Sequence, residues 1–541
     1  MKKSKIFPDS ILNYAVPLSV ILLSAVMLFA RLGHYAIWDD EAMIALSAKG
    51  ILRTGDTSVL IDHNINAFRN GLLVRDLCDR STPPLSAYLA AASMSVFGEN
   101  TWALRFPFAL FGLATVALVM SWALKDKAST QAQILIGMGL LCNVSLILYS
   151  RQCRYYAPTV FFTVAVVWCC LHWRGSRRSL FEIAGLSVLL FAANYFSYVA
   201  LYACIAFDYL VWGRKEKNLK FPDWLSLFVP QVILCAGIAL HWNPLGTKFG
   251  EYVQKNSFSE RVTLFFWNLR DMNQCEFCIA LLLLIAAALA IVKKDTRMAR
   301  GTVAILIYVI LITAMSPQLL AQTSVADIRY LVPLIPLCIV LEVFVIRTLA
   351  GTFFHWAVIP VALLAFGTNL LNGGPWLWHG SRTTTYLSSI GNYVSELISP
   401  PQDPYTVTAL WINRNVASGE SIYVVPDYMV YPLIFHAPRP VYAWQLEGNN
   451  QDPQYRGLPD IHFKGRLMPD YIIVFGPMVQ DITRELKMAA AERGLVYEQV
   501  AKLDCFWQDM FRPELFWRTF TPIKKYNRNL EAIYVFKHKK I

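Results

Sequence analysis

Charged residues are scarce in this 541-residue chain. Asp, Glu, Lys and Arg together make up 16% of it, whereas soluble proteins carry about 25%. Hydrophobic residues reach 56%, and many of them are gathered into runs too long for ordinary core helices. This composition excludes a soluble enzyme and a disordered chain. The sequence therefore predicts a polytopic membrane protein.

The chain also lacks an internal repeat and a small-residue cleavage site behind its short basic start. The missing repeat weakens a transporter interpretation, because many transporters are built from duplicated halves. Without a cleavage site, the first apolar run is expected to remain as a helix instead of being removed as a signal peptide. The eleven cysteines form no framework; Cys275 and Cys278 make an isolated CxxC that could be a disulfide and is weak evidence for zinc.

Apolar runs of roughly 20 residues are long enough to cross a bilayer as helices. About eleven such helices are expected, at residues 11–31, 105–124, 132–149, 156–173, 179–195, 197–213, 225–242, 276–292, 301–317, 329–349 and 354–371. Only Phe196 separates 179–195 from 197–213, so that pair could be divided differently.

The distribution of Lys and Arg predicts the orientation. With a cytoplasmic N-terminus, the basic clusters at Arg174–Arg178 and Lys293–Arg300 fall on inside loops, as the positive-inside rule requires. Most of the net charge of +12 then reflects the basic inside loops that set the orientation, and no nucleic-acid partner is expected. An odd number of helices places the C-terminus outside, in a multi-pass protein of the inner (plasma) membrane.

Two domains are predicted. Residues 1–371 form a transmembrane domain with a long first outside loop (32–104) and a further outside loop at 243–275. Residues 372–541 change composition abruptly and form an extracytoplasmic α/β domain. Its strand-like runs are 421–426, 470–476 and 532–537, with a helical stretch at 481–493.

Three consecutive carboxylates, Asp39, Asp40 and Glu41, follow the first helix directly. Like charges held together at a membrane surface are costly, because each disfavours ionisation of its neighbours. One explanation is structural: Asp39 caps a helix that runs to about Leu52 and ends at Gly55. The other is chemical, since a carboxylate fixed at a helix start is well placed to act as a general base. Both can hold at once.

Four further segments follow this acidic motif in order: Thr82-Pro83-Pro84-Leu85, Phe97-Gly98 leading to Arg105-Phe-Pro107, Arg154-Tyr155, and Arg329-Tyr330-Leu-Val-Pro333. Together they resemble the GT-C glycosyltransferases, and more narrowly the family of protein O-mannosyltransferases and aminoarabinose lipid A transferases. The resemblance covers residues 1–371. It implies a GT-C fold of about eleven transmembrane helices and an extracytoplasmic α/β domain at the C-terminus.

The resemblance also implies a reaction. A hexose or pentose would pass from a polyprenyl-phosphate donor to a hydroxyl of a lipid, glycan or protein, with inversion at the anomeric carbon. Asp40 is our first choice as the catalytic base, with Asp39 second and Glu41 beside them. Membrane lipids are the other expected partners.

Basic residues would stabilise the phosphate that leaves with the lipid. Arg154 and Arg329, with Tyr155 and Tyr330, are the candidates for binding the donor phosphate. The competing explanation is that each arginine reaches a lipid headgroup.

The family places Lys or His directly before the Pro pair, whereas this chain has Thr82. Arg80, Thr82 and His63 are therefore only candidates from the first loop. No cofactor or metal site is predicted; a divalent ion near His34 and His63 stays an open alternative, because their spacing fixes no ligand geometry.

Two other functions are weighed against glycosyl transfer. A transporter or lipid flippase would be expected to place ionisable groups or broken helices at mid-membrane. A non-catalytic partner in envelope assembly would act through its C-terminal domain.

The predicted topology can be tested directly. A phosphatase fused after Ile541 should be active, because the helix count places this end outside. A reporter that works only in the cytoplasm should be silent at the same position. The reverse pattern would show that the number of spans is even.

Overall fold

The fold is that of a computed structural model of the whole chain. It describes residues 9–217, 219–248, 250, 256–275, 279–320, 328–353, 358–368, 389–400, 402–476, 484, 488, 491–506 and 530–540.

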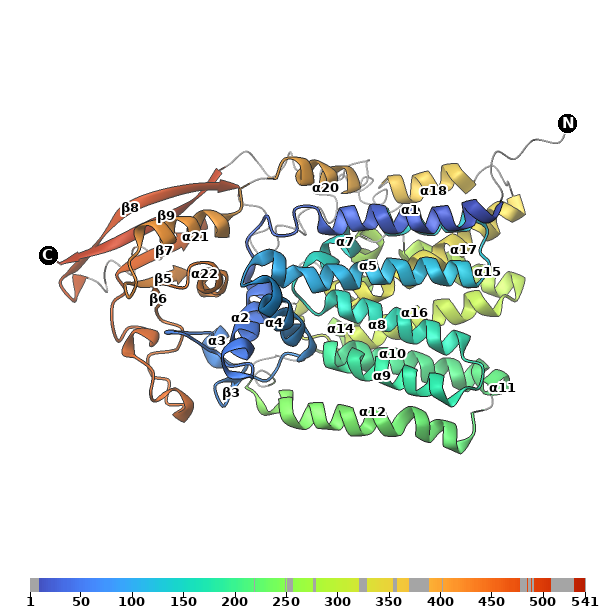
Figure 1. Cartoon of the computed structure of the whole chain (residues 1–541), viewed down its shortest axis with the longest axis horizontal. Helices are drawn as coiled ribbons and strands as arrows, with labels where there is room; N and C mark the ends of the chain where they lie inside the picture. Colours follow the sequence, from blue (N-terminus) through green and yellow to red (C-terminus); the bar gives the residue numbers. More distant parts are fainter. Residues whose placement is uncertain are drawn as a thin grey trace.

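A bundle of long helices occupies one end of the molecule, and its helices run side by side along the long axis (Figure 1). The bundle helices are α1 (Asp9–Phe29), α5 (Thr101–Lys125), α6 (Thr130–Cys142), α7 (Val144–Arg151), α8 (Tyr156–His172), α9 (Arg177–Ala193), α10 (Tyr195–Asp208), α12 (Phe221–Trp242), α14 (Phe258–Cys275), α15 (Ile279–Lys293), α16 (Thr296–Met315), α17 (Ile335–Phe353) and α18 (Val358–Gly367). Their inward side chains form one apolar core, while many large apolar side chains such as Leu22, Val232 and Leu240 are exposed. Exposed apolar helix faces are typical of a membrane protein.

Each expected span overlaps a helix or a helix pair. By length and hydropathy alone, five helices among the described residues could each cross a membrane, or six if the bent pair α6–α7 counts as one span. The count of eleven spans stays a prediction. The outside loop predicted at 243–275 is largely the helix α14, whose amphipathic sequence lacks a long apolar run.

Two helix boundaries differ from those predicted, and an asparagine explains each. The predicted span 132–149 is broken at Asn143, where α6 and α7 meet at 58°. The Asn143 side chain accepts a hydrogen bond from Leu146 N at 2.8 Å and so begins a new helix. Asn194 begins α10 in the same way through Ser197 N, at 3.0 Å, so the division falls there and not at Phe196.

The first loop folds into a layer between the bundle and the other end of the molecule (Figure 1). It holds α2 (Asp39–Thr54), α3 (Phe68–Gly71) and α4 (Leu85–Phe97), together with the short hairpins β1–β2 (Leu60–Ile61, Asn64–Ile65) and β3–β4 (Val74–Arg75, Cys78–Asp79). Helix α2 packs on α4 and on α22 (Val430–His436). The start of α2 therefore lies where three parts of the chain meet.

A mixed five-stranded sheet forms the opposite end, with the strand order β6-β5-β7-β9-β8. The strands are β5 (Ser421–Val425), β6 (Val441–Tyr442), β7 (Tyr471–Phe475), β8 (Leu495–Phe506) and β9 (Leu530–Lys540). Strands β5, β6 and β7 are parallel, while β9 is antiparallel to β7 and β8. We call residues 402–540 the sheet domain. It also contains α21 (Pro404–Asn415) and α22; most of the helix predicted at 481–493 lies outside the described residues.

Side chains of the sheet domain accept hydrogen bonds from the main chain just before the acidic motif. Ala36 N donates to Thr406 Oγ1 at 3.2 Å, and Ile37 N donates to His436 Nε2 at 3.1 Å. Further along the first loop, Asn64 accepts from Tyr442 N at 2.7 Å and donates to the Pro440 carbonyl at 3.0 Å. These contacts fix the sheet domain against the segment that leads into α2.

His436 makes this contact dependent on pH. Burial, together with the positive charges of Arg105 and Lys49, lowers the pKa of His436 from 6.5 to about 3. Its Nε2 accepts a hydrogen bond, which only the neutral ring can do. Between pH 6.5 and 3 the unfolded chain binds a proton that the folded chain does not, so the folded state loses stability as the pH falls through this range.

We expect the melting temperature of the purified protein to fall more steeply between pH 6.5 and 4 than that of the His436→Gln variant. Each pH unit removes about 1.4 kcal/mol from the free energy of unfolding if His436 alone is responsible. Gln can still accept the Ile37 hydrogen bond through its amide oxygen and does not titrate. Parallel pH profiles for the two proteins would contradict the assignment.

Candidate active site

The three carboxylates of the acidic motif occupy the first turn of α2. Trp38 holds the N-cap position and Asp39 is the first helical residue, so the expectation that Asp39 caps the helix is wrong. The Glu41 carboxylate instead accepts a hydrogen bond from the Trp38 N–H, at 3.4 Å. Gly55 ends the helix in the left-handed conformation, with a φ of 82°, as the sequence predicts.

Glu41 forms a buried ion pair with Arg105, near the start of α5. The two side chains are 0% and 1% exposed, and the guanidinium contacts both carboxylate oxygens, at 2.8 and 2.6 Å. The remaining Arg105 donors reach the carbonyls of Leu32, Tyr35 and Ala36. All five donors are satisfied, so the pair joins α2, α5 and the segment between α1 and α2.

Glu41 also accepts a hydrogen bond from Cys153 N at 2.8 Å, next to Arg154. Its carboxylate is enclosed and fully engaged. A general base must reach the proton that it removes, so this geometry gives Glu41 a structural role and leaves Asp39 and Asp40 as the catalytic candidates.

Asp40 lies between two arginines from distant parts of the chain. Its Oδ2 is 2.8 Å from Arg329 Nη1 and 3.3 Å from Arg154 Nη2, and its carbonyl accepts from Arg154 Nη1 at 2.9 Å. The side chains of Asp40, Arg154 and Arg329 are 27%, 12% and 20% exposed. The structure thus brings three of the predicted site residues into one partly open cluster.

Each of these arginines is followed by a tyrosine, and the two tyrosines face each other. The rings of Tyr155 and Tyr330 are stacked, with centroids 6.4 Å apart and an interplanar angle of 21°. Each guanidinium lies over the ring of its own neighbour, at 5.2 Å for Arg154 and 5.9 Å for Arg329. Two Arg-Tyr units, one before α8 and one in the 3₁₀ turn η4 (Ile328–Tyr330), therefore enclose Asp40.

Asp39 lies near the sheet domain. Tyr405 of α21 and Tyr428 of the turn η7 (Asp427–Met429) lie close enough to interact electrostatically with the Asp39 carboxylate. Burial, reinforced by Asp39, raises the pKa of Tyr428 to about 12 and that of Tyr405 well above its usual range. The buried Tyr405 hydroxyl makes no hydrogen bond within the described part of the chain. These tyrosines had no signal in the sequence, because they belong to no motif and reach the site only through the domain packing.

The other first-loop candidates make structural contacts, two of them within the loop and one with the sheet domain. Arg80 pairs through two hydrogen bonds with Asp56, at 2.8 and 2.7 Å. Thr82 Oγ1 donates to Asp79 at 2.9 Å, and His63 Nε2 lies 3.0 Å from the Pro440 carbonyl oxygen. None of these contacts reaches Asp40, so the position before the Pro pair supplies no cation to the cluster.

No group of three or more His, Cys, Asp or Glu side chains within the described ranges could hold a metal ion. The expectation that the protein needs no cofactor stays a prediction. Part of the Cys275–Cys278 motif lies outside the described residues.

The sequence and the structure are similar to those of known proteins. Residues 81–241 match the family model of dolichyl-phosphate-mannose-protein mannosyltransferases. The structure is similar over 97% of both chains to ArnT from Cupriavidus metallidurans, with a TM-score of 0.54 and 13% identity for the apo state. The same protein bound to undecaprenyl phosphate gives 0.55 and 14%. The chain therefore shares the overall fold of ArnT.

The match to the family model contains Thr82, Arg105, Arg154 and Tyr155, but neither the acidic motif nor Arg329. An uncharacterized protein of Aquifex aeolicus is 28% identical over 147 residues, which are 27% of this chain and 26% of that protein. The similarity in fold to ArnT thus extends along almost the whole chain, whereas the sequence similarity is confined to parts of it.

The Glu41–Arg105 pair predicts a large effect on stability. Glu41→Gln leaves the buried guanidinium without its counter-charge, and breaking such a pair costs about 3–5 kcal/mol. We expect a clear drop in melting temperature and in yield of folded protein in detergent. Asp62→Asn is the matched control, because the Asp62–Arg53 pair is exposed and worth at most about 1 kcal/mol. Equal losses in the two variants would show that the buried pair is not an anchor.

Proposed function

We propose that this protein is a membrane glycosyltransferase that moves a sugar from a polyprenyl-phosphate donor to a hydroxyl acceptor, with inversion, on the outer face of the membrane. The observation that carries the proposal is the position of Asp40 between Arg154 and Arg329. A base and two phosphate-binding cations are the parts that this reaction needs, and they lie together. The similar ArnT structure with undecaprenyl phosphate supports a polyprenyl-phosphate donor.

The arginines supply the electrostatic part of the reaction. Two guanidinium groups can take up the negative charge that develops on the phosphate as the glycosidic bond breaks. Arginine suits this role because its planar fork matches phosphate oxygens and stays charged. The tyrosine under each guanidinium limits its movement, so both donors are set before the donor lipid arrives.

Binding of the phosphate also changes the surroundings of Asp40. Without a ligand, the charge of Asp40 is balanced by the two arginines that contact it. A phosphate that shares these arginines leaves the carboxylate less neutralised, and an ionised carboxylate near a second anion takes up a proton more readily. Donor binding thereby prepares Asp40 to accept the proton of the attacking hydroxyl.

The acceptor is proposed to approach from the side of the sheet domain. Asp39, Tyr405 and Tyr428 provide a carboxylate and two phenols, which are groups that hydrogen-bond to hydroxyl-rich molecules. Asp39 is the second candidate for the base, since it lies nearest to this side. Whether the acceptor is a lipid, a glycan or a protein follows from the experiment below.

A flippase is the second candidate, and two observations favour it. The bent pair α6–α7 is a broken helix, and the side chain of Glu342 in α17 is 6% exposed and forms no ion pair within the described residues. Buried carboxyls and broken helices occur in transporters. A flippase would need neither the cluster around Asp40 nor chemical transfer of label.

The direct test is to incubate membranes that contain the protein with a panel of radiolabelled polyprenyl-phosphate sugars and to locate the label. Transfer to a lipid, polysaccharide or protein fraction would support the proposal and identify both substrates. Label that stays on the polyprenyl carrier with every sugar, while the carrier moves between leaflets, would support the flippase.

Asp40→Asn should lower turnover by about a hundredfold to ten-thousandfold, because Asn cannot accept the acceptor proton. Donor binding should be retained, since both arginines remain. The fold should be little changed, because the side chain keeps its shape. Turnover and donor binding are measured separately on purified protein.

Asp39→Asn is the matched control, and a smaller loss is expected. If Asp39→Asn abolishes turnover while Asp40→Asn spares it, the base is Asp39. Normal turnover in both variants would remove the chemical basis of the proposal.

A further inference from the structure

A small cleft lies beside the outer end of α1, away from the Asp40 cluster. It lies between the segment after α1, helix α7 and helix α20 (Ser389–Ile398), and its empty space, open solvent included, is about 330 Å³. Its polar lining consists of Arg31, His34, Tyr35, Arg151 and Glu396. Nothing in the proposed transfer reaction uses this cleft.

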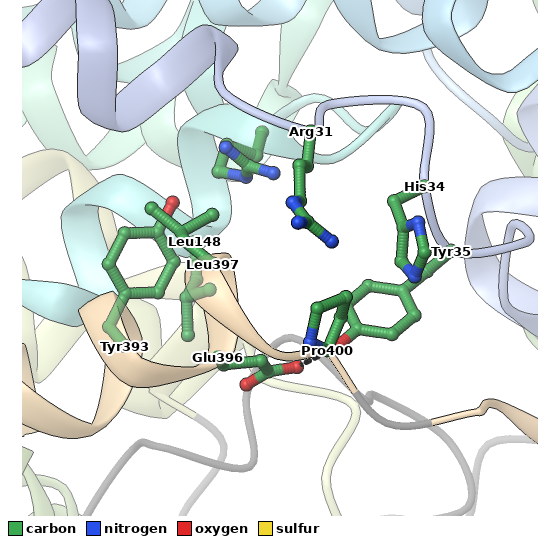
Figure 2. Close-up of a pocket in the computed structure, with 9 residues that line it drawn as sticks. Arg31, His34, Tyr35, Leu148, Tyr393, Glu396, Leu397 and Pro400 are labelled. Atoms are coloured by element: carbon green, nitrogen blue, oxygen red, sulfur yellow. Dashed lines mark hydrogen bonds between the residues drawn. The ribbon is translucent and has the colours of Figure 1, made fainter.

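Two guanidinium groups and one carboxylate line the cleft, and the carboxylate, that of the buried Glu396, accepts a hydrogen bond from the Tyr35 hydroxyl. Arg31 reaches from the segment after α1 into the space beside His34 and Tyr35 (Figure 2). Its one hydrogen bond is from Nη2 to the Ile398 carbonyl, at 3.1 Å. No ion pair joins Arg31 or His34 to a carboxylate within the described residues, so the Arg31 guanidinium keeps donors for a ligand, while the His34 ring lies edge-on to Tyr35.

Arg151 is the fixed part of the site. It is 5% exposed, and its Nη1 lies 2.8 to 3.0 Å from three carbonyls at the end of α1, those of Met27, Leu28 and Ala30. Its Nε and Nη2 make no hydrogen bond in the part of the chain that the structure describes. A buried guanidinium with unused donors that lines a cleft is a built anion site, because desolvated cationic donors bind anions strongly.

The position of the cleft indicates where the anion comes from. Helix α1 exposes Leu22 and Val26 on the way to the cleft, and α20 exposes Val394 and Ile398 beside it. Exposed apolar side chains that border cationic donors match a molecule with apolar chains and an anionic head. A bilayer offers such molecules at high local concentration at this depth, where α1 has just ended.

We propose that the cleft formed by Arg31, His34 and Arg151 binds the headgroup of an anionic phospholipid from the leaflet on the side of the sheet domain. The phosphate oxygens accept hydrogen bonds from the two guanidinium groups, and the acyl chains lie on the exposed apolar side chains of α1 and α20. The bound lipid joins α20, which leads into the sheet domain, to the end of α1. This site is separate from the donor site at Asp40.

The experiment uses the full-length protein in nanodiscs of phosphatidylcholine with increasing amounts of phosphatidylglycerol. Native mass spectrometry counts the phosphatidylglycerol molecules retained, and the titration gives the affinity of the tightest one. Arg31→Gln should weaken that affinity about tenfold, as expected for loss of one charge-assisted contact. Arg31→Lys should lie between Arg31→Gln and the wild type, because Lys keeps the charge without the fork.

Arg178→Gln is the matched control, because the Arg178 side chain is 90% exposed at the opposite end of the bundle, and this variant should bind as the wild type does. Arg31→Gln should also keep the melting temperature of the wild type in phosphatidylcholine alone, which separates lost binding from lost folding. Equal phosphatidylglycerol affinity in Arg31→Gln and the wild type would overturn the proposal.

Two further arms distinguish other sources of the same anion. Inorganic phosphate added to phosphatidylcholine nanodiscs should leave the melting temperature unchanged; a rise that Arg31→Gln abolishes would mean a free-anion site. Polyprenyl phosphate should not displace the bound phosphatidylglycerol. Displacement would assign the cleft to the donor lipid and would overturn the proposal. No arm measures turnover, so the result does not depend on the proposed enzymatic activity.

Discussion

The buried pair of Glu41 and Arg105 is the contact on which the active site depends. One guanidinium holds a carboxylate of α2 and three carbonyls of the segment between α1 and α2, and the same carboxylate holds the main chain beside Arg154. These contacts fix the height and the rotation of the first turn of α2. Asp40, next to this anchored residue, lies between its two arginines.

The three adjacent residues of the acidic motif therefore contact different parts of the molecule. Successive residues of a helix point in directions about 100° apart. In the first turn of α2, Glu41 turns toward α5, Asp40 toward the two Arg-Tyr units, and Asp39 toward the sheet domain. Two of the three adjacent charges are compensated by arginines from different parts of the molecule, Glu41 by Arg105 and Asp40 by Arg154 and Arg329.

Much of this arrangement was accessible from the sequence. Long apolar runs predicted the helices, because their length and composition are set by the bilayer, and the motif order predicted that Asp40, Arg154 and Arg329 belong together. The break at Asn143 was missed, and the one at Asn194 was expected at Phe196, because an apolar window averages over a single capping residue. The roles of Tyr405, Tyr428 and His436 could not be predicted, since they follow from how the sheet domain packs on a loop more than 360 residues earlier. The amphipathic helix α14 was missed because its polar residues give its sequence the composition of a loop.

The hydrogen bonds between the sheet domain and residues 36 and 37 use main-chain N–H groups of the loop, and only the sheet domain contributes side chains to them. Any residue except proline offers the same donor at those two positions. Residues 36 and 37 can therefore be substituted in relatives while Thr406 and His436 keep the same hydrogen bonds. Paired substitutions across this interface will be rare in relatives, so methods that infer contacts from co-varying positions should underestimate how firmly the two parts are joined.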